Sequence, residues 1–416
     1  MQRQPASSLD LFTDSVRLMG DATMIAVMEF GRRLDMRRLF EAASRCIDAF
    51  PILSSKLVRG SGPAYWDLQG RKASDEILSV NFIEERDYRP HVPLAMDPYG
   101  DAQSKIRLLR SPDRDVIIIN LAHAAADGHG LMVMANTLLN AYLDPSSVPM
   151  STGGLPVRDT LWTAGLIDKL DASDEEMDQE TSMWPSFCGR SHGSSSYHRM
   201  VIPQDEVLRI KQAAHSCGAT INDVLLSAYF LSLSDLTGND RPQNLSFPAD
   251  LRQHLTDGTR VMSNQAANIS FPIQREPGDR TEATLAKVVR ETKRLKMGLV
   301  GVREQVAFDR LSDPEGRNVH RMVQEMARKQ DDGLANIFIS NPGPFPLPSV
   351  DGLTDAYVCY PGSLMPSTCF VVSTFRGAMS VTMGYQNDDE PRDATRRALQ
   401  GFVEHIPVDV SKVKCL

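Results

Sequence analysis

The sequence predicts an α/β protein of two similar-sized lobes, each a mixed β-sheet with flanking helices. Strand patterns and helix patterns alternate in both halves of the chain, which is typical of this fold class. The chain has 416 residues, 42% of them hydrophobic, and single cores stop growing at roughly 250–300 residues. We therefore expect an N-terminal lobe over residues 1–150, a crossover linker over 151–196 and a C-terminal lobe over 197–416.

The first half carries two helix patterns and a hairpin. Apolar residues recur every three or four positions from Met36, and Pro51 marks the end of that helix, with a strand after it. Two β-rich runs at 105–111 and 115–123 are separated by turn formers, which predicts a hairpin. The run at 128–143 then predicts a helix that is buried on one face.

The second half alternates in the same way after a stretch of turn formers and acidic residues at 144–196. Thr220 and Asn222 are typical helix-start residues ahead of an apolar helix that Gly238 closes. The other predicted elements are strands at 197–203, 244–252, 268–273, 335–343 and 378–388, and helices at 204–216 and 283–299.

Composition excludes several classes of partner and compartment. The net charge of −8, without a basic stripe, argues against nucleic acid. The longest apolar stretch, from Val116, falls short of the ~20 residues of a membrane span, and the N-terminus lacks the apolar centre of a signal peptide. Six cysteines are scattered without CxxC spacing, so we expect reduced thiols in a cytoplasmic protein. We also expect a monomer.

His123 stands four residues before an Asp-Gly pair, Asp127 and Gly128. It could be an inert, hydrogen-bonded core residue, a metal ligand, or a base. A metal site is not expected, because His129 is six residues on and no HExxH or CxxC accompanies it. A residue at the carboxyl end of a strand, followed by small residues and a helix start, lies where α/β folds expose reactive side chains.

HxxxDG on a strand-to-helix turn resembles the signature of the chloramphenicol acetyltransferase-like superfamily, which includes alcohol O-acyltransferases and the condensation domains of peptide synthetases. Further segments resemble its motifs in the same order: the opening segment from Leu39, the Asn-Asp helix from Ala219, the DLR segment from Phe247, the GN strand from Ala266, the SN-x-G turn from Phe338 and the late strand from Gly377. The sequence departs from the pattern at Ala122, where condensation domains have a first histidine, and at Ala267, where the GN strand has glycine.

The resemblance implies two acetyltransferase-like lobes with a substrate tunnel at their interface. It implies that His123 is a general base that deprotonates a hydroxyl or amine directly, without an acyl-enzyme. The sequence has no GxSxG nucleophile motif, which agrees with direct transfer. Asp127 would pair with Arg252 in a structural role; the alternative is two separate surface charges. The backbone N–H of Gly128 would face the oxyanion or the acceptor.

Other residues carry weaker expectations. Ser340 and Asn341 would line the channel and donate to the thioester oxygen, or else form an ordinary Asn-Pro-Gly turn. His129 is expected to face solvent or cap the helix. Asn222 and Asn268 are expected to hold backbone rather than do chemistry.

The implied activity is transfer of an acyl group from acyl-CoA to a small metabolite, with no tightly bound cofactor. One alternative is a condensation-type enzyme that takes its acyl group from a carrier protein. The other is an inactive relative that acts as a binding protein.

Overall fold

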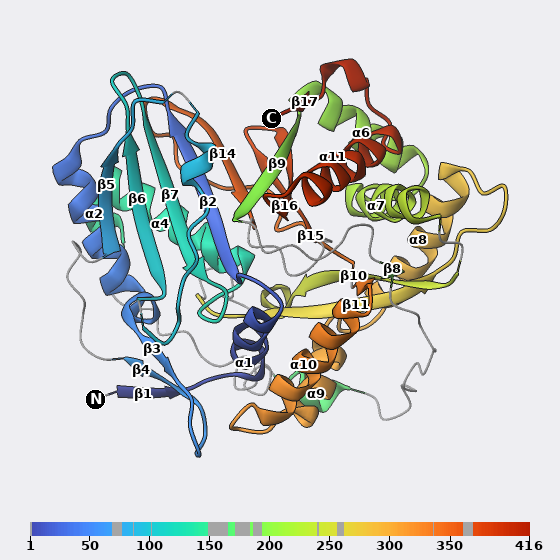
Figure 1. Ribbon diagram of the computed structural model, residues 1–416, viewed down its shortest axis with the longest axis horizontal. Coiled ribbons are helices and arrows are strands. Elements are labelled where there is room, and N and C mark those ends of the chain that lie inside the picture. The colour runs from blue at the N-terminus through green and yellow to red at the C-terminus, as the bar shows by residue number, and fades with distance from the viewer. Residues whose placement is uncertain are drawn as a thin grey trace.

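The computed structural model describes residues 2–68, 77–85, 87–100, 102–148, 165–170, 184–185, 194–238, 241–255, 262–335, 337–360 and 369–416. Most of the linker predicted at 151–196 lies outside these residues. The described chain builds one sheet of five strands and one of seven, with helices packed on each (Figure 1). This is the mixed α/β architecture predicted from the sequence.

The first sheet has the strand order β14-β2-β7-β6-β5. Its strands are β2 (Thr23–Phe30), β5 (Leu78–Phe82), β6 (Ser104–Arg110), β7 (Asp115–Ala122) and β14 (Leu353–Cys359). The helices α2 (Met36–Ala49) and α4 (Gly128–Leu143) pack together against this sheet. The predicted hairpin is β6 and β7, which pair antiparallel from Arg110 opposite Asp115.

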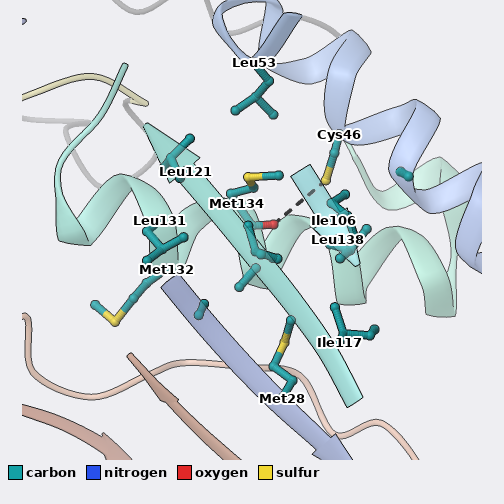
Figure 2. Packing of buried hydrophobic residues seen from close by; sticks show 14 of the residues in the cluster. Met28, Cys46, Leu53, Ile106, Ile117, Leu121, Leu131, Met132, Met134 and Leu138 are labelled. Carbon is teal, nitrogen blue, oxygen red and sulfur yellow. Dashed lines mark hydrogen bonds between the residues drawn. The ribbon is translucent and has the colours of Figure 1, made fainter. Parts of the chain in front are cut away.

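Strand β7 is buried along its whole length, which accounts for its continuous apolar run. Figure 2 shows Leu131, Met134 and Leu138 of α4 meeting Ile117 and Leu121 of β7 in the core. The Cys46 thiol of α2 donates to the Met134 carbonyl at 3.9 Å in the same core. The packing of β7 against α4 therefore fixes their relative position, and with it the position of residues 123–127 that connect them.

The edge strand β14 corrects the predicted division of the chain. Residues 353–359 were assigned to the C-terminal lobe, but β14 pairs antiparallel with β2, with Cys359 opposite Ile25 (Figure 1, orange beside blue). An unpaired edge strand leaves a row of backbone donors and acceptors unsatisfied, and β14 satisfies that row for β2. Sequence patterns do not show a strand partner that lies so far along the chain.

The second sheet has the order β11-β10-β13-β15-β16-β9-β17. Its strands are β9 (Ser195–Ile202), β10 (Gln243–Asp250), β11 (Ala266–Ile273), β13 (Phe338–Ser340), β15 (Cys369–Phe375), β16 (Ala378–Gln386) and β17 (Lys414–Cys415). The helices of this half are α6 (Gln204–Ser216), α7 (Ile221–Thr237), α8 (Thr281–Lys296) and α11 (Asp389–Glu404).

Helix α7 begins and ends at the capping residues that the sequence predicted. Thr220 and Asp223 form a reciprocal capping box at its start, and Gly238 ends it in the left-handed conformation at φ 62°. Most of its residues are buried, because helices and sheet cover it on several sides. The predicted start and end of this helix are thus confirmed by their local chemistry.

Several elements were not predicted from the sequence. They are the helices α1 (Ser8–Ser15), α9 (Val302–Leu311), α10 (Arg317–Asp331) and α11, and the strands β1 (Gln2–Pro5), β2, β4 (Tyr65–Leu68), β5, β8 (Trp184–Pro185), β14, β15 and β17. The short strands β3 (Lys56–Val58) and β12 (Leu334–Ala335) overlap predicted strands. Helix α1 packs against α9 and α10 from the second half, with the rings of Phe12 and Phe308 5.6 Å apart. In the described part of the chain, none of the helices has the length and apolar character of a bilayer span.

Candidate functional site

His123 directly follows β7, at the carboxyl end of that strand. Its backbone N–H donates to the carbonyl of Ala22, just before β2, at 3.1 Å. Residues 124–127 are buried, whereas His123 as a whole residue is partly exposed. This partial exposure at the end of β7 argues against an inert histidine sealed in the core of the first sheet.

The hydrogen bond of the ring determines which nitrogen is reactive. Nδ1 of His123 lies 3.1 Å from the carbonyl oxygen of Ala126. A carbonyl oxygen only accepts, so Nδ1 carries the proton, and in the neutral ring the lone pair is on Nε2. Burial lowers the pKa of His123 below its ordinary value of 6.5, against the opposing effect of the Asp127 charge. The ring is thus neutral near pH 7 and able to take a proton.

Asp127 and Arg252 form the ion pair that the resemblance implied. The guanidinium donates to the two carboxylate oxygens at 2.8 and 3.1 Å, and both side chains are buried. The alternative of two separate surface charges does not fit this burial. Burial by itself raises the pKa of Asp127, but the Arg252 charge and the hydrogen bonds outweigh it, so that the pKa lies below its ordinary value.

The carboxylate of Asp127 also organises the backbone on both sides of the seam between the sheets. It accepts from the N–H of Gly130 at 2.9 Å, as the cap of α4, and from the N–H of Gln265 at 2.7 Å. Arg252 follows β10 and Gln265 precedes β11, so one carboxylate joins the His123 turn to the second sheet. Its place in the site is structural, because its oxygens are occupied by protein donors.

The two glycines at the start of α4 differ in the space around them. A Cβ on Gly130 would lie 2.7 Å from the Cβ of Ala126, which real structures do not tolerate. A Cβ on Gly128 would make an ordinary contact at 3.9 Å with Pro342. Gly128 therefore faces the turn after β13 across the seam, where the sequence placed the channel.

That turn is held by its own asparagine. The Nδ2 of Asn341 donates to Oδ1 of Asn222 at 2.8 Å, and the N–H of Gly343 donates to Oδ1 of Asn341 at 3.1 Å. These bonds are those of a closed turn anchored to α7. Asn222 was expected to hold backbone, but it contacts the side chain of Asn341 instead. Ser340 lies beside it and is half-buried. Donation from Ser340 or Asn341 to a thioester stays a prediction.

A small hollow lies on the second-sheet side of this turn. Its wall consists of residues from α7, β10, β13 and the turn after β13: Asn222, Leu225, Leu226, Phe247, Pro248, Ile339 and Asn341. The strands β10 and β13 pair only at Ser246 and Phe338, so they diverge beside the hollow.

Asn264 is a site residue that the sequence analysis missed. Its Nδ2 lies 3.0 Å from the carbonyl of His123, 2.9 Å from that of Ala124 and 2.9 Å from Oδ1 of Asp10. The backbone role was expected of Asn268 instead, but that residue is exposed on β11. Asn268 lies within a regular strand, whereas Asn264 lies in the irregular segment that reaches the His123 turn, and this difference explains why Asn264 holds the backbone. The order SNQAAN offered two asparagines, and only the tertiary contacts select the first.

Tyr360, immediately after β14, was also missed. Its ring meets the His123 ring edge to face, with centroids 6.2 Å apart and planes at 72°. His129 is half-buried, with Nδ1 3.5 Å from Oδ2 of Asp250. In the described segments, no three His, Cys, Asp or Glu side chains gather as metal ligands.

The cysteines of the described residues are free thiols, namely Cys46, Cys217, Cys359, Cys369 and Cys415. Cys188 lies outside the described residues. Burial raises the pKa of the Cys369 thiol to about 12, so that this thiol is protonated near neutral pH.

Comparison of the whole structure with solved structures gives extensive matches. Polyketide synthase associated protein 5 from Mycobacterium tuberculosis matches with a TM-score of 0.65 at 14% identity, over 96% of this chain and 98% of that chain. The first condensation domain of the calcium-dependent antibiotic synthetase matches with 0.65 at 14%, over 100% and 99%. The two-lobed fold is that of condensation domains and chloramphenicol acetyltransferase-like proteins.

A third match is the TRI3 trichothecene 15-O-acetyltransferase from Fusarium sporotrichioides, with a TM-score of 0.68 at 13% identity, over 97% and 93% of the two chains. No protein-family model and no curated protein matches the sequence. The fold expected from HxxxDG and its companion motifs is therefore confirmed by the shape of the chain.

Proposed function

We propose that the chain is an acyltransferase that moves an acyl group from a thioester, acyl-CoA, to a hydroxyl or amine of a small metabolite. The observation that carries the proposal is the His123 ring. Its Nδ1–H donates to the Ala126 carbonyl, so the lone pair of the neutral ring is on Nε2. The residue is partly exposed. The fold is shared with an acetyltransferase and with condensation domains, which supports the same class of reaction.

The reaction is a direct transfer. Nε2 of His123 takes the proton of the acceptor as its oxygen or nitrogen attacks the thioester carbon, and the carbonyl electron pair moves onto oxygen. Collapse of this intermediate expels the thiolate, which takes the proton back from Nε2. The high pKa of the buried Cys369 thiol supports a route without an acyl-enzyme on that residue.

Binding and orientation come from the seam between the sheets. Gly128 opens α4, so its backbone N–H has no partner within the helix and is available to the developing oxyanion or the acceptor. The two substrates would reach His123 through a tunnel between the lobes. The thioester is a co-substrate and not a resident cofactor.

The test is incubation with a panel of acyl-CoAs and candidate acceptors, with mass spectrometry for acylated product. A His123→Ala variant should stay folded and lose at least ~10²-fold in rate, because a positioned base contributes about 10²–10⁴-fold. Wild-type rates in this variant would exclude His123 as the base.

A second arm separates the two donor types. The same acyl group is offered on CoA and on a phosphopantetheinylated carrier protein, because several similar structures are parts of peptide synthetases. Faster transfer from the carrier protein would assign a condensation-type enzyme. Binding of acyl-CoA without any product from either donor would assign a binding protein instead.

A further inference from the structure

The hydroxyl of Tyr360 is a buried polar group without a partner in the described part of the chain. The side chain is 8% exposed, and its Oη finds no hydrogen-bond partner among the described residues. A buried hydroxyl that is left unpaired costs about 1–3 kcal/mol, so native proteins rarely keep one without a reason. The same ring packs edge to face against the His123 imidazole.

Tyr357, three residues earlier, provides the contrast. It lies within β14, the strand that ends just before Tyr360, and it is also buried. Its hydroxyl is paired with the hydroxyls of Tyr197 at 2.6 Å and Tyr88 at 3.2 Å. The surroundings of β14 can therefore satisfy a tyrosine hydroxyl, and they do so on the face of the sheet away from His123.

The proposed transfer needs donors for the oxyanion. The candidates were Ser340 and Asn341, and of these Asn341 already donates through Nδ2 to Asn222 and accepts through Oδ1 from Gly343. Gly128 supplies a backbone N–H, and acyl transfer commonly uses two or more donors. Burial raises the pKa of Tyr360 well above its ordinary value, so its hydroxyl stays protonated and can only act as a donor to an anion.

We propose that Tyr360 is a further catalytic residue, whose hydroxyl donates a hydrogen bond to the oxygen of the thioester carbonyl as it becomes an oxyanion. This inference rests on the proposed acyl transfer. The acceptor proton goes to Nε2 of His123 and the carbonyl electron pair goes to the oxygen that faces Tyr360. When the thiolate leaves, the electron pair returns to the carbonyl and Tyr360 keeps its proton throughout.

The test compares Tyr360→Phe with the matched control Tyr357→Phe. We expect Tyr360→Phe to melt at the wild-type temperature or above, because it removes a hydroxyl for which the described residues offer no partner. It should lose about 10²–10³-fold in kcat with KM little changed, the effect of removing one oxyanion donor. Tyr357→Phe should melt lower, because it breaks two hydrogen bonds. It should keep kcat within about threefold, because its hydroxyl contacts other tyrosines and not the His123 ring, and a threefold change corresponds to only about 0.6 kcal/mol.

The outcomes separate this inference from the proposed function. If the wild type transfers acyl groups and His123→Ala does not, the proposed function stands, and an unchanged kcat in Tyr360→Phe overturns the role of Tyr360 alone. A melting temperature that falls in Tyr360→Phe as much as in Tyr357→Phe also overturns it, because the hydroxyl is then paired within the protein. A wild-type chain without transfer activity overturns both.

Discussion

Two buried polar clusters join the two sheets, and they differ in how completely their atoms are paired. The His123 cluster consists of Asp10, His123, Asp127, Arg252 and Asn264. The Tyr357 cluster consists of Glu29, Tyr88, Tyr197, Arg199, Tyr357 and Asp355. Both clusters connect the first sheet to the second by side-chain hydrogen bonds.

The Tyr357 cluster is fully paired among the described residues. Arg199 donates to Asp355 at 2.7 Å and to Ser380 at 2.8 Å, and its guanidinium lies 3.8 Å from the centre of the Tyr357 ring. Tyr88 donates to Glu29 and contacts Tyr357. These contacts hold the two sheets together, and they leave no unpaired hydrogen-bonding group in this cluster for a ligand.

The His123 cluster keeps unpaired atoms beside a strong ion pair. Oδ1 of Asn264 is buried and has no hydrogen-bond partner among the described residues, and neither has the neighbouring Tyr360 hydroxyl. Nε2 of His123 is left with its lone pair. The two clusters therefore differ in pairing: the Tyr357 cluster is closed, whereas unpaired polar atoms remain around His123, the proposed base.

The largest expected effect comes from the two buried arginines. Arg252→Met leaves the Asp127 charge buried, with a side chain 4% exposed, and should cost roughly 3–5 kcal/mol of unfolding free energy. Arg199→Met leaves Asp355, whose side chain is 37% exposed and can be rehydrated, so that about 1–3 kcal/mol is expected. Urea unfolding of both variants measures the difference. Equal losses would contradict the view that only the His123 cluster holds a sealed charge pair.

A smaller effect is expected at the start of α4. Gly130→Ala should cost roughly 1–3 kcal/mol, because the new Cβ would lie 2.7 Å from that of Ala126 and the turn must shift. Gly128→Ala is the control, with an ordinary 3.9 Å contact to Pro342 and an expected change of about 0.5 kcal/mol or less. Thermal unfolding distinguishes them. Equal stability of the two variants would show that the His123 turn is loosely packed.

The smallest effect is on the pH profile. Burial lowers the pKa of His123, so the neutral, proton-accepting form persists as the pH falls below 6.5. The acidic limb of kcat/KM should therefore have its midpoint below 6.5, with no loss of activity at neutral pH. The same measurement on Tyr357→Phe should give the same midpoint, because that cluster does not contact the imidazole. A midpoint above 6.5 would mean that the imidazolium is stabilised, as in a paired structural histidine.

The lowered pKa of His123 also makes the free energy of unfolding depend on pH. A folded-state pKa below the unfolded value means that the unfolded chain binds the proton first as the pH falls. The contribution of His123 to the free energy of unfolding is therefore present in full above the unfolded-state pKa of about 6.5. It is lost as the pH falls from there toward the lower folded-state pKa.

Local chemistry made much of the fold predictable. The helices α2, α4 and α7 follow from apolar periodicity and from capping residues such as Asp127 and Thr220, which act on backbone groups three positions away. The hairpin of β6 and β7 follows from a short turn. The elements that were missed, such as α1 and α10, are stabilised by contacts between distant parts of the chain, which local patterns do not contain.

The candidate site divides in the same way. His123, Asp127 and Gly128 lie within six residues, so their motif was visible, and Arg252 was reachable only through the resemblance. Asn264 and Tyr360 belong to segments that become neighbours of His123 through the pairing of β14 with β2 and the approach of the second sheet. Nothing in their local sequence indicates that approach.

The sequence by itself determined the alternation of helices and strands and the position of His123, Asp127 and Gly128 between a strand and a helix, since these depend on interactions within a few residues. Only the tertiary structure decided which nitrogen of His123 is free, which asparagine holds its backbone and which tyrosine hydroxyl stays unpaired. Hydrogen bonds to buried groups depend on what the other sheet brings within about 3 Å, and that distance is set by the packing of the whole chain.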